Sequence, residues 1–434
     1  MPPHQLETNG APGTTRRARF ALALALFAAL IACSPEGPRF ERVVLIVVDT
    51  LRRDHVWPHD PGAPTPNVRR LAERGQVFTN AVASFHQTTM SMAALFTGET
   101  PSLETDSRTE PLPWNGRTWC GLSRLATSER DSCIPRHLGT LAEDLRDAGY
   151  WTIGVVTNVF LYRPSGYDRG FIDWVQLGKG RGDERRTRQH RDQVVARRGE
   201  RATQAAIRAL ERRPHDRFLL YVHYMDVHDW APMDRESYAG GVAAMDDALG
   251  TLLDYLEGQG LLEDALVVFT SDHGEMLASD RAIQRRQSHL GNPSFEPVLQ
   301  VPLIVVPPTS DDPATYVRSQ DLRGLVLRWL GHPAPEPSQD LAADEQLLTE
   351  ASWQTYRRWP WKSAWKRQGD AVHLFDLRSP VPDGRDVSKE HPDVLRSHRE
   401  RIDALAGKLA TSRGRDTELT EEDLERLRAL GYAE

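Results

Sequence analysis

The chain contains several runs of apolar residues that have the length of a strand and show no alternation of apolar and polar positions. The first is Arg42–Val48, which contains the letters VVLIVV. A continuous apolar run predicts a strand that is buried on both faces, as in a parallel or mixed sheet. Similar runs occur at Trp151–Val156, Phe218–His223, Ala265–Thr270 and Val301–Val306. Together they predict the strands of one buried sheet.

Segments with helical spacing lie between these runs. They are Asn67–Glu73, His137–Ala148, Ala202–Glu211 and Val242–Glu257. Strands that alternate with helices indicate an α/β fold, with helices on both faces of the sheet. We therefore expect a central mixed, mostly parallel sheet flanked by helices. Beyond about Pro333 the chain turns Pro-rich and polar before a strand-like run at Ala371–Leu377, which predicts a small C-terminal subdomain.

The N-terminus has the features of an export signal. Arg16, Arg17 and Arg19 precede the apolar run Phe20–Ala32, which is shorter than a membrane span and suits a signal peptide. The run ends at Cys33 after small residues, as in a bacterial lipobox, where the cysteine is lipidated; an ordinary secretory signal is the alternative. The expected location is the bacterial cell envelope, facing the periplasm or the cell surface, with the lipid as the only membrane contact.

Composition narrows the class of protein further. The 434 residues include 54 Lys and Arg against 61 Asp and Glu, giving a net charge of −7. Without a basic footprint, we expect no nucleic-acid partner. Cys120 and Cys133 remain after Cys33 is assigned, and in an oxidising compartment they predict a disulfide; two unpaired thiols are the alternative.

Polar clusters follow three of the expected strands, at Asp49–Thr50, at 223–229 and at Ser271–His273. In open α/β sheets ligands bind beyond the carboxyl ends of the strands, so these clusters indicate one site. Carboxylate and imidazole ligands from Asp49, Asp272 and His273 suit Zn²⁺, Mn²⁺ or Ca²⁺. Further candidate ligands are Asp226, His228 and His289.

Several longer motifs resemble the sulfatase family of the alkaline phosphatase superfamily. They are VVLIVVDTLRRDHV, TPNVRRLAERGQVFTNAVAS, LFTGETP, LYVHYMDVHDWAP, VVFTSDHGE and VPLIVV, in the family's order from about residue 41 to the end. The resemblance implies an alkaline-phosphatase-like fold. We expect a signal peptide at 1–32, a tether at 33–40, a sulfatase-like catalytic domain at 41–332 and a C-terminal subdomain at 333–434.

The resemblance also locates a nucleophile. Sulfatases carry a Cys or Ser in C-x-P-S-R-x-x-L-x-T-G, which is converted to formylglycine. Alignment on Leu95–Gly98 places Thr88 at this position, with Met90 and Met92 in place of the Pro and Arg. Threonine cannot form that aldehyde, but related phosphodiesterases of the superfamily use an unmodified Thr that a metal activates. The alternative is that Thr88 only caps a helix beginning near residues 89–90.

The resemblance implies a divalent ion bound by Asp49, Asp272, His273 and Thr88, with His228 and His289 contacting the anion or assisting the leaving group. In two-metal relatives a D-x-x-x-H pair helps hold a second ion, whereas this chain has Asp226-x-His228. The number of bound ions, one or two, therefore remains open.

Three functions fit these residues. We expect a metal-dependent hydrolase acting on a small-molecule or glycan sulfate or phosphate ester. The alternatives are a catalytically weak lipoprotein that binds anionic glycans, suggested by Met90 and Met92, and a phosphate-headgroup transferase.

Overall fold

The computed structural model describes residues 40–101, 134, 138–158, 161, 166–177, 198–214, 216–230, 235–280, 295–335, 341–349, 353–366 and 369–405. The lipidation at Cys33, the disulfide between Cys120 and Cys133 and the role of His289 are predictions that lie outside these residues. Among the helices in the described ranges, none combines the length and the apolar character that crossing a membrane requires.

The central sheet has seven strands in the order β2-β8-β7-β1-β6-β4-β5. Its strands are β1 (Arg42–Val48), β2 (Gln76–Val77), β4 (Trp151–Val156), β5 (Asp173–Gln176), β6 (Phe218–Tyr224), β7 (Ala265–Ser271) and β8 (Leu303–Val306). The pairs that join β7, β1, β6, β4 and β5 are all parallel, and β8 is antiparallel to both of its neighbours. The expected mixed, mostly parallel sheet is confirmed.

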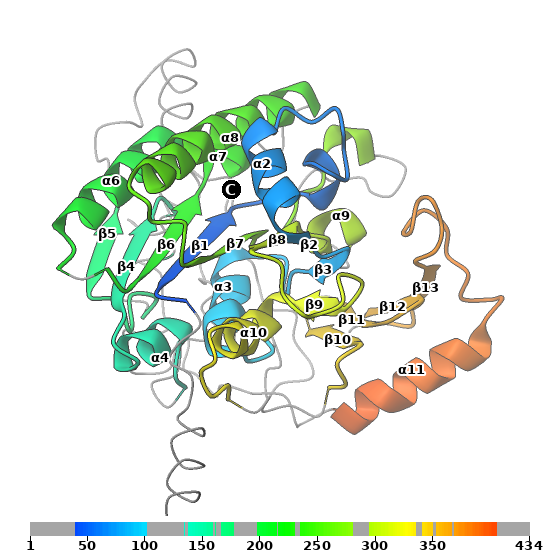
Figure 1. Cartoon of the computed structure of the whole chain (residues 1–434). Helices are drawn as coiled ribbons and strands as arrows, with labels where there is room; N and C mark the ends of the chain where they lie inside the picture. The colour runs from blue at the N-terminus through cyan, green and yellow to red at the C-terminus, as the bar shows by residue number, and fades with distance from the viewer. Residues whose placement is uncertain are drawn as a thin grey trace, which may run out of the picture. The chain divides into compact units, whose positions relative to one another are not determined.

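Both faces of this sheet are covered, which explains the unbroken apolar runs. Along β1, Val44, Ile46 and Val48 pack into one buried cluster, and Val43, Leu45 and Val47 into the other. Residues of α2 (Pro66–Arg74), α6 (Arg198–Arg212) and α8 (Arg235–Gly258) belong to the first cluster, and residues of α3 (Thr88–Thr97), α4 (Leu141–Asp147) and α10 (Leu322–Trp329) belong to the second. Figure 1 shows these two sets of helices on opposite faces of the sheet. Every second residue of a strand points to the same face, so a strand covered on both faces is apolar at every position.

Helix boundaries differ from the expected ones where local capping decides them. The helix expected from His137 begins at Leu141, because Thr140 and Glu143 form a capping box at its start. The Thr140 hydroxyl accepts from the Glu143 amide at 3.2 Å, and the Glu143 carboxylate accepts from the Thr140 amide at 3.0 Å. This reciprocal pairing satisfies amides that the first turn leaves without partners.

A second sheet follows the main one, as expected for the C-terminal subdomain. It is an antiparallel meander of β10 (Glu345–Thr349), β11 (Trp353–Arg358), β12 (Trp361–Lys366) and β13 (Val372–Asp376). Ile402 and Leu405 of α11 (Pro392–Leu405) share a buried cluster with Leu347 and Tyr356 of this sheet. The remaining elements are β3 (Asn80–Val82), which pairs with β9 (Tyr316–Arg318), η1 (Arg53–His55), α7 (Asp226–Trp230), η3 (Ala278–Asp280), α9 (Glu296–Leu299) and η4 (Ser319–Asp321).

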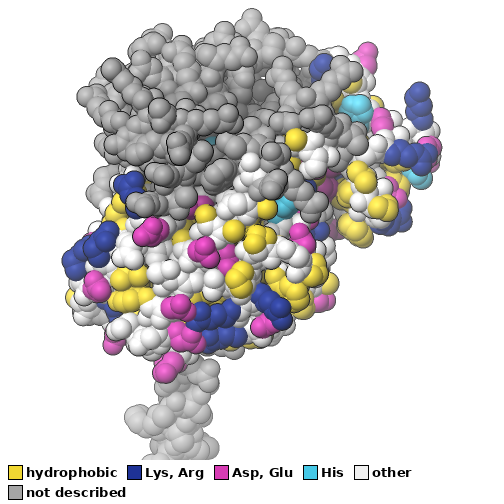
Figure 2. All heavy atoms as spheres, turned by 90° about the horizontal axis from the view of Figure 1, so that it is seen from above, with side chains coloured by type: hydrophobic (Ala, Val, Ile, Leu, Met, Phe, Trp, Pro, Cys, Tyr) yellow, Lys and Arg dark blue, Asp and Glu magenta, His cyan; other side chains and the backbone are white. Residues whose placement is uncertain are grey.

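The surface carries charges of both signs. On the face that Figure 2 shows, acidic and basic side chains of the described residues lie intermixed. The described part of that face therefore presents no extended field of one sign.

Candidate active site

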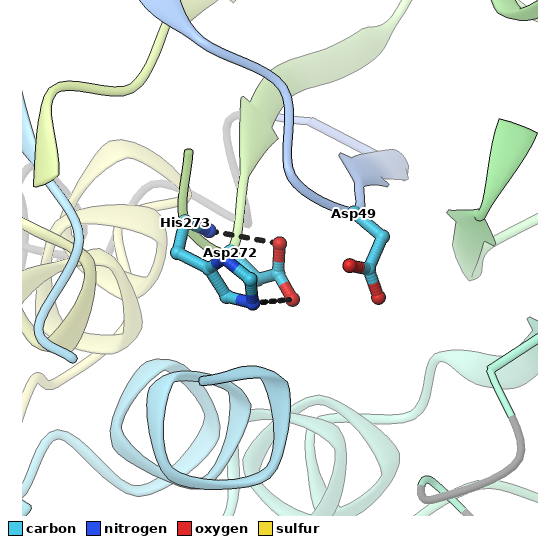
Figure 3. A group of neighbouring side chains, drawn as sticks. All are labelled: Asp49, Asp272 and His273. Carbon is cyan, nitrogen blue, oxygen red and sulfur yellow. Dashed lines mark hydrogen bonds and ion pairs between the residues drawn. The ribbon is translucent and has the colours of Figure 1, made fainter. Parts of the chain in front are cut away.

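The strand register places two carboxylates side by side. Val48 at the end of β1 pairs with Tyr224 on β6 and with Ser271 on β7. Asp49 and Asp272 are the next residues of β1 and β7, so they leave the sheet together at its carboxyl edge. Both are fully buried. Figure 3 shows them facing each other, with the ring of His273 beside Asp272.

The two oxygens of Asp49 have different surroundings. Its Oδ2 lies 2.6 Å from Asn158 Nδ2, 3.2 Å from His223 Nε2 and 3.2 Å from Thr88 Oγ1. Its Oδ1 is buried, and no described residue donates a hydrogen bond to it. A buried carboxylate oxygen without a donor is costly unless a cation satisfies it.

Asp272 shows the same division. Its Oδ1 accepts from the backbone amides of Thr50 at 3.2 Å and of His273 at 2.8 Å. Its Oδ2 has no hydrogen-bond donor within the described ranges and lies 3.6 Å from His273 Nε2. In each aspartate, one carboxylate oxygen therefore accepts hydrogen bonds from described residues, and the other oxygen can bind a cation.

The imidazole of His273 has a defined tautomer. Its Nδ1 lies 2.8 Å from the carbonyl oxygen of Gly274, which can only accept, so Nδ1 carries the hydrogen. In the neutral ring Nε2 is then an acceptor, as a metal ligand must be. A Cβ at residue 274 would lie 2.1 Å from the carbonyl oxygen of Pro297, so glycine is required for this close approach.

The carboxylates are electrostatically coupled. Burial raises the pKa of Asp49, but the hydrogen bond from His223 and the nearby histidines outweigh it and hold that pKa below its usual range. Burial and the charge of Asp49 raise the pKa of Asp272 to about 7. Two buried carboxylates with oxygens within 4.8 Å of each other repel when both are charged, so they favour one retained proton or a bound cation.

These residues fit a divalent metal ion. One ligand atom each from Asp49, Asp272 and His273 lies within 4.8 Å of the others, and all three residues are buried. Asp49 and Asp272 each offer a carboxylate oxygen to which no residue in the described ranges donates, and His273 offers an imidazole nitrogen that carries no hydrogen in the neutral ring. This mixed oxygen and nitrogen set suits Zn²⁺ or Mn²⁺.

Thr88 lies against this group at the beginning of α3. Its Oγ1 is 3.2 Å from Asp49 Oδ2 and 3.4 Å from His273 Nε2. The helix cap is Gln87, and it makes no side-chain capping bond, so Thr88 is the first helical residue and not a cap. The structure therefore contradicts the capping alternative and leaves the hydroxyl directed at the candidate ligands.

Met90 and Met92 pack into the core. Met90 joins a buried cluster with Phe85, Leu299 and Leu348. Met92 belongs to the buried cluster on the face of the central sheet that α3 and α10 cover. These two side chains are fully buried among apolar residues, so the observation that suggested a catalytically weak protein has a packing explanation.

The other candidate ligands lie differently. The charge of His228 helps lower the pKa of Asp49, which places His228 near the group, and only 8% of its surface is exposed. Asp226 instead accepts a hydrogen bond of 2.9 Å from the Gly199 amide in the first turn of α6. It is not among the residues whose ligand atoms converge.

Two residues of the site, Asn158 and His223, could not be assigned a role from the sequence. Asn158 follows β4, and its side chain donates to Asp49 Oδ2 and lies 3.4 Å from Thr88 Oγ1. His223, on β6, pairs in register with Val47 of β1. The available signal was weak: each is a polar residue at the end of a buried strand, and only the strand order shows that β6 lies beside β1.

Curated relatives match parts of the chain. The multifunctional alkaline phosphatase superfamily protein PehA of Trinickia caryophylli is 28% identical over 106 residues, which are 23% of this chain and 20% of that protein. Arylsulfatase K of Xenopus laevis is 26% identical over 196 residues, 39% of this chain and 37% of that protein. The chain thus aligns with less than half the length of these two relatives.

Solved structures match nearly the whole fold. A phosphonate monoester hydrolase of Agrobacterium radiobacter superposes with a TM-score of 0.60 at 16% identity, covering 88% of this chain and 98% of that one. A protein of glycosaminoglycan metabolism from Bacteroides thetaiotaomicron superposes with a TM-score of 0.62 at 18% identity, covering 85% and 99%. At these identities the likeness concerns the fold.

The profile of the sulfatase family matches residues 41–332, which include the edge of the sheet with Asp49, Thr88, Asp272 and His273. This match spans well over half of the chain, and the chain therefore belongs to the sulfatase family.

Proposed function

We propose that the protein is a metal-dependent hydrolase that cleaves sulfate or phosphate esters with Thr88 as its nucleophile. The observation that supports this most directly is the position of Thr88 Oγ1, 3.2 Å from Asp49 and 3.4 Å from His273, beside the three-residue ligand group. Relatives named as arylsulfatase and as phosphonate monoester hydrolase support both sulfur and phosphorus esters as substrate classes.

The chain's own residues would hold one ion through Asp49 Oδ1, Asp272 Oδ2 and His273 Nε2. When bound, a divalent ion lowers the pKa of a coordinated hydroxyl and polarises a non-bridging oxygen of the ester. Asn158 and Asp49 fix the Thr88 hydroxyl from two sides. The number of ions, one or two, and their identity, Zn, Mn or Ca, belong to the proposal.

The start of α3 suits the anionic part of the substrate. Its first intrahelical bond runs from the Ser91 amide to the Gln87 carbonyl, so the amides of residues 88–90 have no acceptor within the helix. Such amides and the helix dipole stabilise negative charge at a helix N-terminus. We assign them to the sulfuryl or phosphoryl oxygens.

The reaction proceeds in two displacements. Thr88 loses its hydroxyl proton to solvent, and Thr88 Oγ then bonds to sulfur or phosphorus as the ester oxygen leaves. His228, with His289 as the second candidate, donates a proton to the leaving oxygen. Water then cleaves the Thr88 ester, which restores the hydroxyl, releases sulfate or phosphate and returns the protons to their original groups.

The proposed setting follows from the predicted lipid anchor at Cys33, which would hold the enzyme at the bacterial cell envelope. The structural likeness to a protein of glycosaminoglycan metabolism supports a glycan ester as one substrate class. A small-molecule ester is the other.

A substrate panel tests the function. The metal-loaded protein and its Thr88→Ala variant are assayed on an aryl sulfate, a phosphate monoester and a phosphodiester. We expect one of them to be hydrolysed in a manner that a chelator stops and Thr88→Ala strongly reduces. A metal-loaded protein that cleaves none of the three would overturn the proposal.

A further inference from the structure

We propose that Tyr221 and His223 are positioning residues for the ion: Tyr221 orients the imidazole of His223, and His223 reserves one oxygen of Asp49 for the metal. This inference rests on the proposed function in one respect only, because it concerns the same site. It requires the site to bind a metal and does not require any particular substrate.

The three residues form a buried chain of contacts. The Tyr221 hydroxyl lies 2.8 Å from His223 Nδ1, and His223 Nε2 lies 3.2 Å from Asp49 Oδ2. Each of the three is fully buried. Tyr221 and His223 are two residues apart on β6, so they share the face of the sheet that α3 covers.

In these contacts each residue donates its hydrogen to the next, from Tyr221 to His223 and from His223 to Asp49. His223 Nδ1 is the hydrogen-bond partner of the Tyr221 hydroxyl within the described part of the chain, and a buried hydroxyl needs an acceptor for its proton. Burial and the charges of Asp272 and Asp49 raise the pKa of Tyr221 well above its usual value, so its hydroxyl stays protonated and donates. His223 Nδ1 then accepts, and Nε2 carries the hydrogen toward Asp49.

His223 and His273 are therefore opposite tautomers: His223 carries its hydrogen on Nε2 and His273 on Nδ1. Both rings lie beside the pair of carboxylates. The Gly274 carbonyl makes Nε2 of His273 a ligand atom, whereas Tyr221 makes Nε2 of His223 a donor. The donated hydrogen joins those of Asn158 and Thr88 at Asp49 Oδ2, while Oδ1 receives none from the residues that the structure describes. Without His223 this partition weakens, and the carboxylate can turn about its Cβ–Cγ bond.

Metal titration tests the inference without any substrate. Mn²⁺ and, separately, Zn²⁺ are titrated into the metal-free full chain by calorimetry. We expect His223→Leu to weaken binding by roughly 10–100-fold, the usual effect of losing a partner of a metal ligand. His223→Gln retains most of the affinity, because its amide nitrogen reaches the place of Nε2.

Tyrosine variants test the first link. Tyr221→Phe keeps the ring and removes the hydroxyl, and it should weaken binding less than His223→Leu. Because Tyr221 acts through His223, adding Tyr221→Phe to His223→Leu should cause no further loss. Tyr224→Phe is the matched control, since that hydroxyl bonds Thr203 at 2.7 Å on the other face of β6, and it should bind metal like the wild type.

Several results would overturn the inference. They are wild-type affinity in His223→Leu, additive losses in the double variant, an equal loss in Tyr224→Phe, or a wild-type protein that binds neither metal. If His223→Leu does not fold, the comparison of Tyr221→Phe with Tyr224→Phe decides. A protein that binds metal as expected but hydrolyses no ester would refute the proposed function and leave this inference standing.

Discussion

The hydroxyl of Ser91 donates a hydrogen bond of 2.6 Å to the backbone carbonyl of Asp272. Ser91 lies one turn after Thr88 on α3, and Asp272 follows β7, so the bond ties the helix of the candidate nucleophile to the strand end of a candidate ligand. Both residues are fully buried. The position of Thr88 relative to the ligand group therefore depends on a residue with no chemistry of its own.

Replacing Ser91 by Ala should lower the free energy of unfolding by about 1–3 kcal/mol, because the buried Asp272 carbonyl loses its donor. Urea denaturation of the metal-free protein measures this loss. Thr89→Ala is the control, because the hydrogen bond of 2.6 Å from the Tyr167 hydroxyl is accepted by the backbone carbonyl of Thr89, which the substitution retains. Equal stability of the two variants would contradict this role for Ser91.

Thr88→Ala should lower kcat by several orders of magnitude, because the covalent route is lost while the ligand group remains. Residual turnover is expected if the ion activates water instead. Thr88→Ser keeps the hydroxyl and should retain measurable activity, with a less restricted side-chain rotamer. Steady-state kinetics with metal content measured in parallel checks this, and normal turnover in Thr88→Ala would mean that Thr88 is not the nucleophile.

Asp49→Ala, Asp272→Ala and His273→Ala should each lower the bound metal and abolish turnover, because all three are assigned to one ion. Elemental analysis of the purified variants gives the metal content. Asp226→Asn should retain the metal at this site, since Asp226 contacts Gly199 instead. Unchanged metal content in all three alanine variants would remove the site.

The loss of stability between neutral and acid pH should depend in part on Glu296. Burial raises the pKa of this carboxylate, but Arg357 and Lys362 outweigh it and hold the pKa well below its usual value. Lys362 lies 3.1 Å away and Arg357 3.2 Å away. Since the folded pKa lies below the unfolded value of about 4.3, the stabilisation is present above that pH and disappears as the pH falls further.

Glu296→Gln should thus reduce the free energy of unfolding at pH 7, and its difference from the wild type should shrink at low pH. Urea denaturation across this pH range is the measurement. Glu73→Gln serves as the control, because Glu73 forms an exposed pair with Arg69 that contributes little. A Glu296→Gln deficit that is constant with pH would show that the charge is not responsible.

Cys33→Ser should move the protein from the membrane to the soluble fraction, because an acyl chain binds a bilayer through its buried methylene groups. Fractionation of cells that express each form measures this. Cys120→Ser should leave the distribution unchanged. A Cys33→Ser protein that stays at the membrane would refute the lipid anchor.

The strands β1, β4, β6, β7 and β8 of the central sheet were predictable from the sequence, because strands buried on both faces are apolar at every position. The edge strands β2 and β5 were not predicted, and β5 is only partly buried. The run at Arg42–Val48 is β1 without any change of boundary. Asp49, Asp272 and His273 were predictable as one group for a related reason: each follows such a run, and parallel strands bring their carboxyl ends to the same edge. The start of α4 was missed because a capping box overrides the helical pattern before Thr140.

Strand order and side-chain direction were decided only by the tertiary structure. Nothing local to β6 indicates that it lies beside β1, so His223 was expected only as part of the polar cluster at 223–229, and its contact with Asp49 was not predictable. Asp226 follows a buried strand in the same way as Asp49, yet its carboxylate turns to the first turn of α6. Sequence patterns report burial and period, which are local properties, whereas a ligand group requires side chains from distant segments to converge, and only packing determines that.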